Sequence, residues 1–242
     1  MAISVDTVYQ RVLALTNKEQ RGYITPQEFN LFANHAQEEI FEQYFYDLNQ
    51  AARVPGNDYV VADVDDMIEE KMQIFENQDT GGVVAGYAPA PFGAGTKFLP
   101  AYIYRVQRVV YNNKTCEILR TKDFDDVRFG GPLTAPDKER PIANIRNNVL
   151  RVVNDKDPLT GFKLPTEVHY YRKPNNIVWG YIVLNKKALY DPGNSIHFEL
   201  HQSEESELVY KILKFAGVSM KREDVAGAAQ SAEMLQIQQE KK

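Results

Sequence analysis

Two histidines four residues apart, His197 and His201, form the pattern in this chain that comes closest to a catalytic metal site. A zinc-protease motif places two histidines on one helical face with a glutamate directly after the first, so that the imidazoles hold the ion and the carboxylate activates water. Here the glutamate is displaced to Glu199, and the segment has the composition of a strand. The other histidines, His35 and His169, stand beside no obvious nucleophile or acid. The sequence therefore predicts no metal site and no catalytic histidine.

Acidic pairs and glycine-rich runs are the other patterns that could hold an ion or a phosphate. Acids two residues apart occur in segments 63–66 and 155–157, but neither has the glycine and glutamate positions of an EF-hand loop. The glycine-rich segments 81–86 and 93–97 fit neither the dinucleotide nor the Walker A spacing, and no helix pattern follows them. We therefore expect no cofactor and no enzymatic activity, with the first acidic segment on a solvated helix face and the second in a turn.

Basic residues in the middle of the chain could contact nucleic-acid phosphates, and the tyrosines among them could stack on bases. Tyrosine is also an ordinary strand and interface residue, and the remaining chain is acidic, so sequence-specific DNA binding is the weaker interpretation. The basic residues are Arg105, Arg108, Arg120, Arg128, Arg140, Arg146, Arg151, Arg172 and Lys173, and the tyrosines are Tyr102, Tyr104, Tyr111, Tyr170 and Tyr171.

Composition is that of a folded protein with an uneven charge distribution. The 242 residues are 43% hydrophobic with a net charge of −5, which predicts one large domain or two small ones around a real core. Residues 1–80 hold 5 Lys or Arg and 15 Asp or Glu, whereas residues 101–190 hold 16 and 9. Regions of opposite charge could attract one another between copies in an assembly, and ordinary surface charge is the alternative.

Membrane and disulfide features are absent from the sequence. No stretch approaches the roughly 20 apolar residues of a membrane span, and the first residues lack the basic and apolar regions of a signal peptide. The single Cys116 excludes an internal disulfide and a cysteine zinc cluster. We therefore expect a soluble protein made in the reducing cytoplasm of its host, with no membrane partner.

The N-terminal residues 1–76 have helical spacing. Residues 25–28, Thr-Pro-Gln-Glu, form a capping box, and Ile24 and Phe29 form a hydrophobic staple, so a long helix begins here. Apolar spacing predicts a preceding helix over about 5–16, antiparallel to the long one, and a short acidic helix over 62–75.

Residues 77–100 contain five glycines and three prolines, a density that cannot sustain a helix. The apolar residues among them favour a loop that packs against another chain over a plain linker. The predicted inter-subunit residues are Val83, Val84, Tyr87, Phe92 and Phe98.

Residues 101–200 form a β region. Short runs rich in Val, Ile and Tyr alternate with turn signals such as Asn112-Asn113 and Asn147-Asn148, which predicts an antiparallel meander or small sandwich. Because helices precede and follow the strands instead of alternating with them, the expected class is α+β.

Residues 201–242 return to helix and form a predicted C-terminal arm. A first helix has an apolar face and ends at Gly217, and a second helix, rich in alanine, is capped by Asp224. An isolated tail of this kind is marginally stable, so we expect it to pack with the N-terminal helices and with a partner. The predicted partner contacts are Val225, Ala228, Ala229, Ala232, Met234 and Leu235.

The segment 17–30 resembles the N-terminal helical hairpin of structural proteins in short-tailed phages, especially the crAss-like phages of gut Bacteroidetes. The pattern N-K-E-Q-x-G-Y-[IV]-[ST]-P-x-x-F-N stands here from Asn17 to Asn30. Residues 148–174, Trp179 and residues 206–230 are similar to the head-to-tail adaptor or tail-tubular family. The resemblance covers nearly the whole chain in order, and the long 49–100 insertion departs from the compact adaptor pattern.

The resemblance implies a non-enzymatic virion subunit of a head-to-tail connector. Such subunits form a ring, commonly of twelve copies, that docks on the portal protein through a terminal helix and contacts adjacent tail or ring proteins. Duplex DNA then passes through the lumen without sequence specificity. The alternative is a soluble phage DNA-binding or packaging accessory protein that uses the basic β region.

Overall fold

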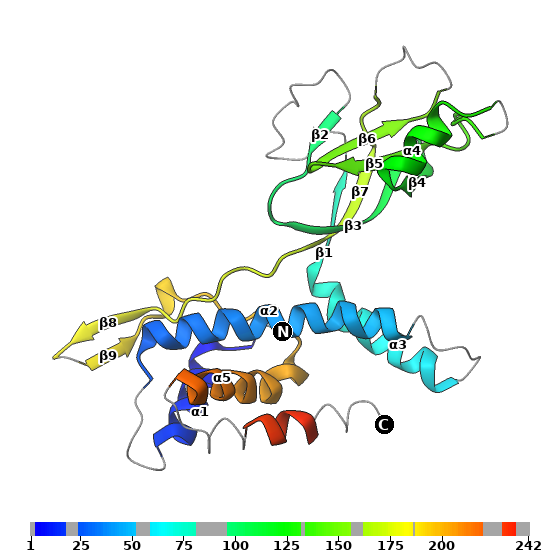
Figure 1. Ribbon diagram of the computed structural model, residues 1–242. Coiled ribbons are helices and arrows are strands. Elements are labelled where there is room, and N and C mark those ends of the chain that lie inside the picture. The colour runs from blue at the N-terminus through cyan, green and yellow to red at the C-terminus, as the bar shows by residue number, and fades with distance from the viewer. Residues whose placement is uncertain are drawn as a thin grey trace. The chain divides into compact units, whose positions relative to one another are not determined.

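The computed structural model describes residues 3–17, 24–51, 59–80, 96–131, 134–155, 162–185, 187–219 and 229–235. The chain divides into two units (Figure 1). The helical unit consists of Met1–Ile74 and Pro174–Lys242, and the sheet unit consists of Phe75–Lys173. Helices near both ends of the chain with a sheet between them in sequence confirm the predicted α+β class.

The capping box at the start of the long helix is confirmed. The Thr25 amide donates to Glu28 Oε2 at 2.9 Å, and the Glu28 amide donates to Thr25 Oγ1 at 3.3 Å. These two bonds satisfy amides that the first helical turn leaves without partners. Ile24 and Phe29 are both buried, as the hydrophobic staple predicts. The helix α2 (Pro26–Ala51) runs on for 26 residues.

Four helices and a further helical segment surround the core in the described part of the helical unit. α5 packs against both α1 and α2, and α3 packs against α2. The apolar face predicted for α5 is confirmed, since Leu208 and Ile212 are fully buried, but the helix continues past Gly217 and ends at Ser219. The elements are α1 (Val5–Asn17), α2, α3 (Tyr59–Met72), α5 (Glu205–Ser219) and the segment 229–235, with 3-10 turns η2 (Pro192–Asn194) and η3 (Gln202–Glu204). The 3-10 turn η1 (Gln73–Phe75) crosses the boundary between the two units.

An amide ladder on α2, formed by Asn30, Asn34 and Gln37, binds the extended segment that follows residue 174. Asn34 Oδ1 accepts from the Ile177 amide at 2.7 Å, and Asn34 Nδ2 donates to the Ile177 carbonyl at 3.0 Å. Asn30 Oδ1 accepts from the Trp179 amide at 2.8 Å, and Asn30 Nδ2 donates to the Trp179 carbonyl at 3.4 Å. Asn30, Asn34 and Gln37 share one face of the helix because they are three and four residues apart. Alternate residues of an extended chain share one side, so every second residue of the segment meets this face.

The segment continues into a two-stranded hairpin of β8 (Tyr181–Leu184) and β9 (Lys187–Tyr190). At its base the buried Trp179 ring lies 4.3 Å from that of Tyr9, and its Nε1 donates to Asp6 Oδ1 at 3.1 Å. The hairpin is therefore attached to the helical unit through a buried tryptophan.

The sheet unit has seven strands in its described part, and five of the six neighbouring pairs are antiparallel. The exception to the predicted antiparallel meander is β4 with β5, which are parallel because α4 (Thr121–Arg128) connects them. In sheet order the strands are β1 (Glu76–Thr80), β7 (Glu167–Arg172), β3 (Ile103–Tyr111), β4 (Lys114–Leu119), β5 (Ile142–Arg146), β6 (Val149–Val153) and β2 (Thr96–Phe98).

Two clusters of buried residues form the core of the sheet unit. The larger one gathers Val109, Leu150 and Val168 from three strands, and the smaller one places Phe124 of α4 against Ile142 and its neighbours. The Asn-Asn pairs at 112–113 and 147–148 have positive φ and close the β3–β4 and β5–β6 hairpins, as their sequence predicts.

Some strands lie outside the ranges that the sequence suggests. β1 and β2 fall at 76–80 and 96–98, at the ends of the predicted loop, and residues 174–200 belong to the helical unit. The segment 195–200, which has the composition of a strand, forms isolated bridges instead, Val178 with Ile196 and Ile3 with Phe198. Whether a segment forms a strand depends on its pairing with a neighbouring strand, which composition alone does not predict.

Candidate functional site

The histidine pair caps backbone groups. His197 Nδ1 accepts from the Val5 amide at 3.3 Å, and His201 Nδ1 accepts from the Ser203 amide at 3.3 Å, at the start of η3. The acids at 63–66 lie in α3, and Asp155 is exposed. Among the described residues, no three His, Cys, Asp or Glu side chains gather closely enough to hold a metal ion. Segment 81–86 lies outside the described residues.

The predicted inter-subunit loop lies mostly outside the described residues. Phe98 is in β2, where its backbone pairs with Val149 at the edge of the sheet. The remaining four predicted contacts, Val83, Val84, Tyr87 and Phe92, lie outside the described part of the chain.

The predicted partner contacts of the C-terminal arm fall into different environments. Ala229 is buried and Ala232 is half-buried, whereas Met234 and Leu235 are 56% and 60% exposed. The segment therefore has one face on its own chain and leaves two large apolar side chains uncovered. Val225 and Ala228 lie outside the described residues.

A buried ion cluster, formed by Lys211, Lys214, Glu39, Glu207 and Glu233, holds that segment in place. Lys211 is 1% exposed, and its Nζ lies 2.8 Å from Glu233 Oε1, 3.2 Å from Glu39 Oε1 and 3.5 Å from Glu207 Oε1. Lys214 Nζ lies 3.3 Å from Glu233 Oε2. One carboxylate thus ties the helical segment 229–235 to two lysines of α5.

Electrostatics in this cluster favour the ionised forms. Burial alone would lower the pKa of Lys211, but the hydrogen bond to Glu233 and the charges of Glu207, Glu233 and Glu39 raise it above the ordinary lysine value. Burial alone would raise the pKa of Glu233, and the two lysines instead hold it below its ordinary value. A buried ion pair therefore anchors the segment.

The predicted basic residues of the sheet unit have different surroundings. Arg128 and Arg151 are half-buried, with their guanidinium carbons 4.9 and 5.3 Å from the ring centre of Phe162. Arg108 donates to Thr115 Oγ1 at 2.9 Å across the β3–β4 hairpin. Arg128 and Arg151 pack against the fold and Arg172 is half-buried, whereas Arg105, Arg108, Arg120, Arg140, Arg146 and Lys173 are exposed.

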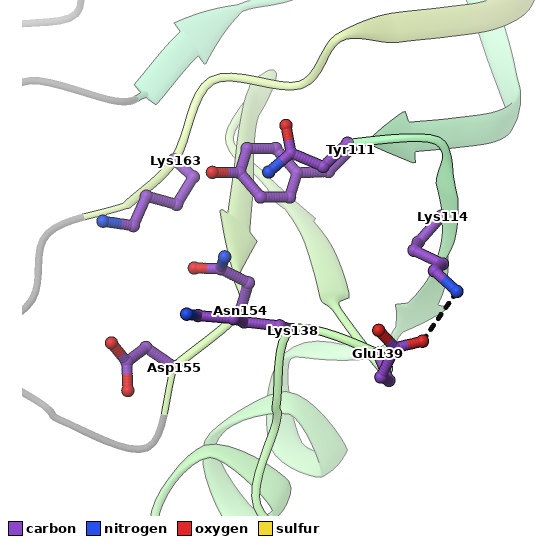
Figure 2. A pocket seen from close by; sticks show the side chains of 8 residues that line it. Tyr111, Lys114, Lys138, Glu139, Asn154, Asp155 and Lys163 are labelled. Carbon is purple, nitrogen blue, oxygen red and sulfur yellow. Dashed lines mark ion pairs between the residues drawn. The ribbon is translucent and has the colours of Figure 1, made fainter.

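A polar pocket of about 460 Å³ opens on the sheet unit (Figure 2). Three lysines and two carboxylates line it, so its charged groups sum to +1. Lys114 turns away to Glu139, with its Nζ 2.6 Å from Glu139 Oε2, while Lys138 and Lys163 lie around the hollow. The lining residues are Tyr111, Asn112, Lys114, Lys138, Glu139, Asn154, Asp155 and Lys163.

Ammonium and amide donors of this kind can bind an anion such as a backbone phosphate. Sequence reasoning missed the pocket because its lysines stand at 114, 138 and 163, and the turns of the sheet bring them together. The same holds for Lys211 and Glu233, which are 22 positions apart.

The division of charge matches the division into units. The helical unit carries 13 Lys or Arg and 22 Asp or Glu, a net charge of −9, whereas the sheet unit carries 15 and 11, a net charge of +4. Opposite charge on two units of one chain favours contacts between unlike units or surfaces of different copies.

No protein-family model matches the chain, and neither does any curated protein. None of the helices in the described ranges is long and apolar enough to cross a membrane.

Proposed function

We propose that this protein is a structural subunit of a phage head-to-tail connector, a ring that docks on the portal protein and forms part of the DNA channel. Its partners are copies of itself, the portal, adjacent tail or ring proteins, and duplex DNA in the lumen, and its place is the head-to-tail interface of the virion. The resemblance of segment 17–30 suggests the class.

The observation that carries the proposal is the arrangement of segment 229–235. Glu233 anchors the segment to its own α5, and Met234 and Leu235 stay exposed beside it. A docking helix needs both a fixed position and an uncovered apolar surface, because a pre-ordered surface loses less conformational entropy on binding. This segment supplies both.

Replacing the exposed pair tests the docking role. Met234→Ser with Leu235→Ser removes the apolar contact and leaves the Lys211 ion pair intact, so we expect at least tenfold weaker co-sedimentation with the cognate portal ring. Truncation after Gly217 is a less specific test, because it also removes Glu233 and leaves Lys211 buried with fewer partners. Phe129→Ser, at an exposed site of the sheet unit, is the control. Unchanged portal binding by the double variant contradicts the docking role.

The second candidate is a soluble DNA-binding or packaging accessory protein. The observation that favours it is the lysine-lined pocket on the sheet unit, whose net charge is +4. It requires tight, salt-sensitive binding of the isolated subunit to duplex DNA. Lys138→Ala with Lys163→Ala should then reduce the salt slope by about 0.9 for each phosphate that the protein no longer neutralises. Weak binding together with portal-dependent ring formation favours the connector.

A further inference from the structure

The β8–β9 hairpin exposes large apolar side chains to solvent. Ile182, Val183, Leu184 and Leu189 are 61%, 64%, 58% and 50% exposed. The hairpin forms a sheet of two strands, and no third strand among the described residues pairs with either of its edges. An isolated hairpin is at best marginally stable in water, and a contiguous apolar surface of this kind marks an interaction site.

The base of the hairpin is fixed, so its end is presented in a defined position. The Gly180 amide donates to Ser195 Oγ at 3.0 Å, and the Asp191 amide donates to the Gly180 carbonyl at 2.9 Å. A Cβ at Gly180 would lie 2.8 Å from the Asn194 backbone, so only glycine allows this approach. The ring centres of Tyr181 and Tyr190 each lie 5.8 Å from that of Trp179. A rigid base lowers the entropy cost of docking the exposed end.

Charge selects the partner of the hairpin. Residues 181–190 contain two lysines, Lys186 and Lys187, and no acid. Pairing of two hairpins would bring like charges together, and the sheet unit is itself basic, so both are disfavoured as partners. The helical unit, with its net charge of −9, is the complementary surface on this chain.

The part of the helical unit that fits the hairpin is its acidic end, which we define as Glu42, Tyr46, Asp66, Met67, Glu69 and Glu70 on α2 and α3. All six side chains are exposed, and Tyr46 and Met67 are 57% and 58% exposed. The set combines acids that can attract Lys187 with apolar groups that can cover Ile182 and Leu184.

The hairpin and the acidic end lie toward opposite ends of α2 (Figure 1). The hairpin is anchored at Asn30 through Trp179, and α3 meets α2 near Tyr44, where Lys71 Nζ lies 6.0 Å from the tyrosine ring centre. Fourteen residues of helix span roughly 21 Å. Two complementary surfaces this far apart on one unit cannot satisfy each other, but they can join successive copies head to tail.

We propose that the β8–β9 hairpin of one copy docks on the acidic end of the next copy. The contact is heterologous, because each copy offers a different surface to each of its two neighbours. Closure of this contact into a ring rests on the proposed connector function, whereas the contact itself is a property of the isolated chain.

Two variants with complementary defects test the contact. The hairpin variant carries Ile182→Ser, Leu184→Ser and Lys187→Ser, and the acidic-end variant carries Glu69→Lys and Glu70→Lys. All five side chains are exposed, so both variants should fold, which circular dichroism and thermal unfolding can verify. Phe129→Ser is the matched control, because it removes an apolar side chain of similar exposure from the sheet unit.

Sedimentation velocity of the full chain gives the readout. The wild type and Phe129→Ser should form species larger than a dimer, and each complementary variant alone should remain monomeric. An equimolar mixture of the two variants should form a one-to-one dimer and nothing larger, because one intact hairpin then meets one intact acidic end.

Three results overturn the proposal. They are a wild-type chain that stays monomeric up to the solubility limit, a hairpin variant that still assembles by itself, and a mixture that stays monomeric while the wild type assembles. Co-sedimentation with the portal, measured on the same variants, separates the two ideas. Portal binding without dimer formation in the mixture overturns the hairpin contact and leaves the connector function standing.

Discussion

Lys211 Nζ and Glu233 Oε1 lie 2.8 Å apart in the interior of the helical unit, and the two side chains are 1% and 8% exposed. A lysine buried to this degree needs a carboxylate, because an ammonium group moved out of water loses several kcal/mol of hydration free energy. The pair joins α5 to the segment 229–235, and Glu233 Oε2 also lies 3.3 Å from Lys214 Nζ, so one carboxylate ties the C-terminal segment to two lysines.

Replacing Glu233 with alanine should destabilise the helical unit. Glu39 and Glu207 still neutralise Lys211 in part, so we expect a loss of about 3 kcal/mol in the free energy of unfolding, at the low end for breaking a buried pair. Urea denaturation followed by circular dichroism measures it. Glu38→Ala, an exposed glutamate on α2, is the control and should change stability by less than about 0.5 kcal/mol. A similar small change for Glu233→Ala would contradict the anchoring role.

The free energy of unfolding should fall at acidic pH, because Glu233 becomes protonated. The pKa of Glu233 is lowered in the folded protein, so near and below the ordinary glutamate pKa the unfolded chain binds more protons than the folded one. The stabilising contribution is therefore complete above the ordinary value and is lost as the pH falls through the lower, folded-state value. The difference in unfolding free energy between the wild type and Glu233→Gln should shrink between pH 7 and pH 3. A constant difference over that range would rule out titration of Glu233 as its source.

Asn34→Ala should release the segment that carries the hairpin. The change leaves both the amide and the carbonyl of Ile177 without their side-chain partner, which should cost about 2 kcal/mol. Hydrogen exchange at the Ile177 amide should become at least tenfold faster. Asn49→Ala is the matched control, because the side-chain amide of Asn49 donates to the Phe45 carbonyl of its own helix. Equal exchange rates in the two variants would mean that the amide ladder does not hold the segment.

Thr25→Ala tests the helix start. It removes the hydroxyl that accepts from the Glu28 amide, and the usual cost of losing such a cap is about 1 kcal/mol. The lowered pKa of Glu28, which the Thr25 amide and then the Thr25 hydroxyl cause, should move back toward its ordinary value. Chemical denaturation and a carboxyl titration by nuclear magnetic resonance measure the two effects. Gln27→Ala, an exposed change in the same turn, should alter neither.

The sequence predicts those features of the fold that neighbouring residues determine. Four consecutive residues, 25–28, determine the cap of α2, and the Asn-Asn pairs mark two hairpin turns because asparagine tolerates positive φ. The apolar face of α5 follows from helical spacing, although Gly217 does not end the helix, since α5 is buried there and packs on its neighbours.

Features that depend on distant residues were not predictable from spacing. The segment Glu-Asn-Gln-Asp-Thr of β1 has poor strand propensity and becomes a strand because it pairs along its whole length with β7. Asn34 and Ile177 are 143 positions apart, so the amide ladder has no local signature. The predicted partner contacts have different exposure for the same reason. Ala229 and Met234 both fit a helix in the sequence, but Ala229 is buried in the fold and Met234 is exposed.

Cryo-electron microscopy of the intact phage particle is the most direct test of the connector assignment. We predict a ring of this chain between the portal and the tail, with segment 229–235 against the portal and the β8–β9 hairpin against the acidic end of the neighbouring copy. A particle whose head-to-tail interface is fully built from other proteins, with this chain absent, would contradict it.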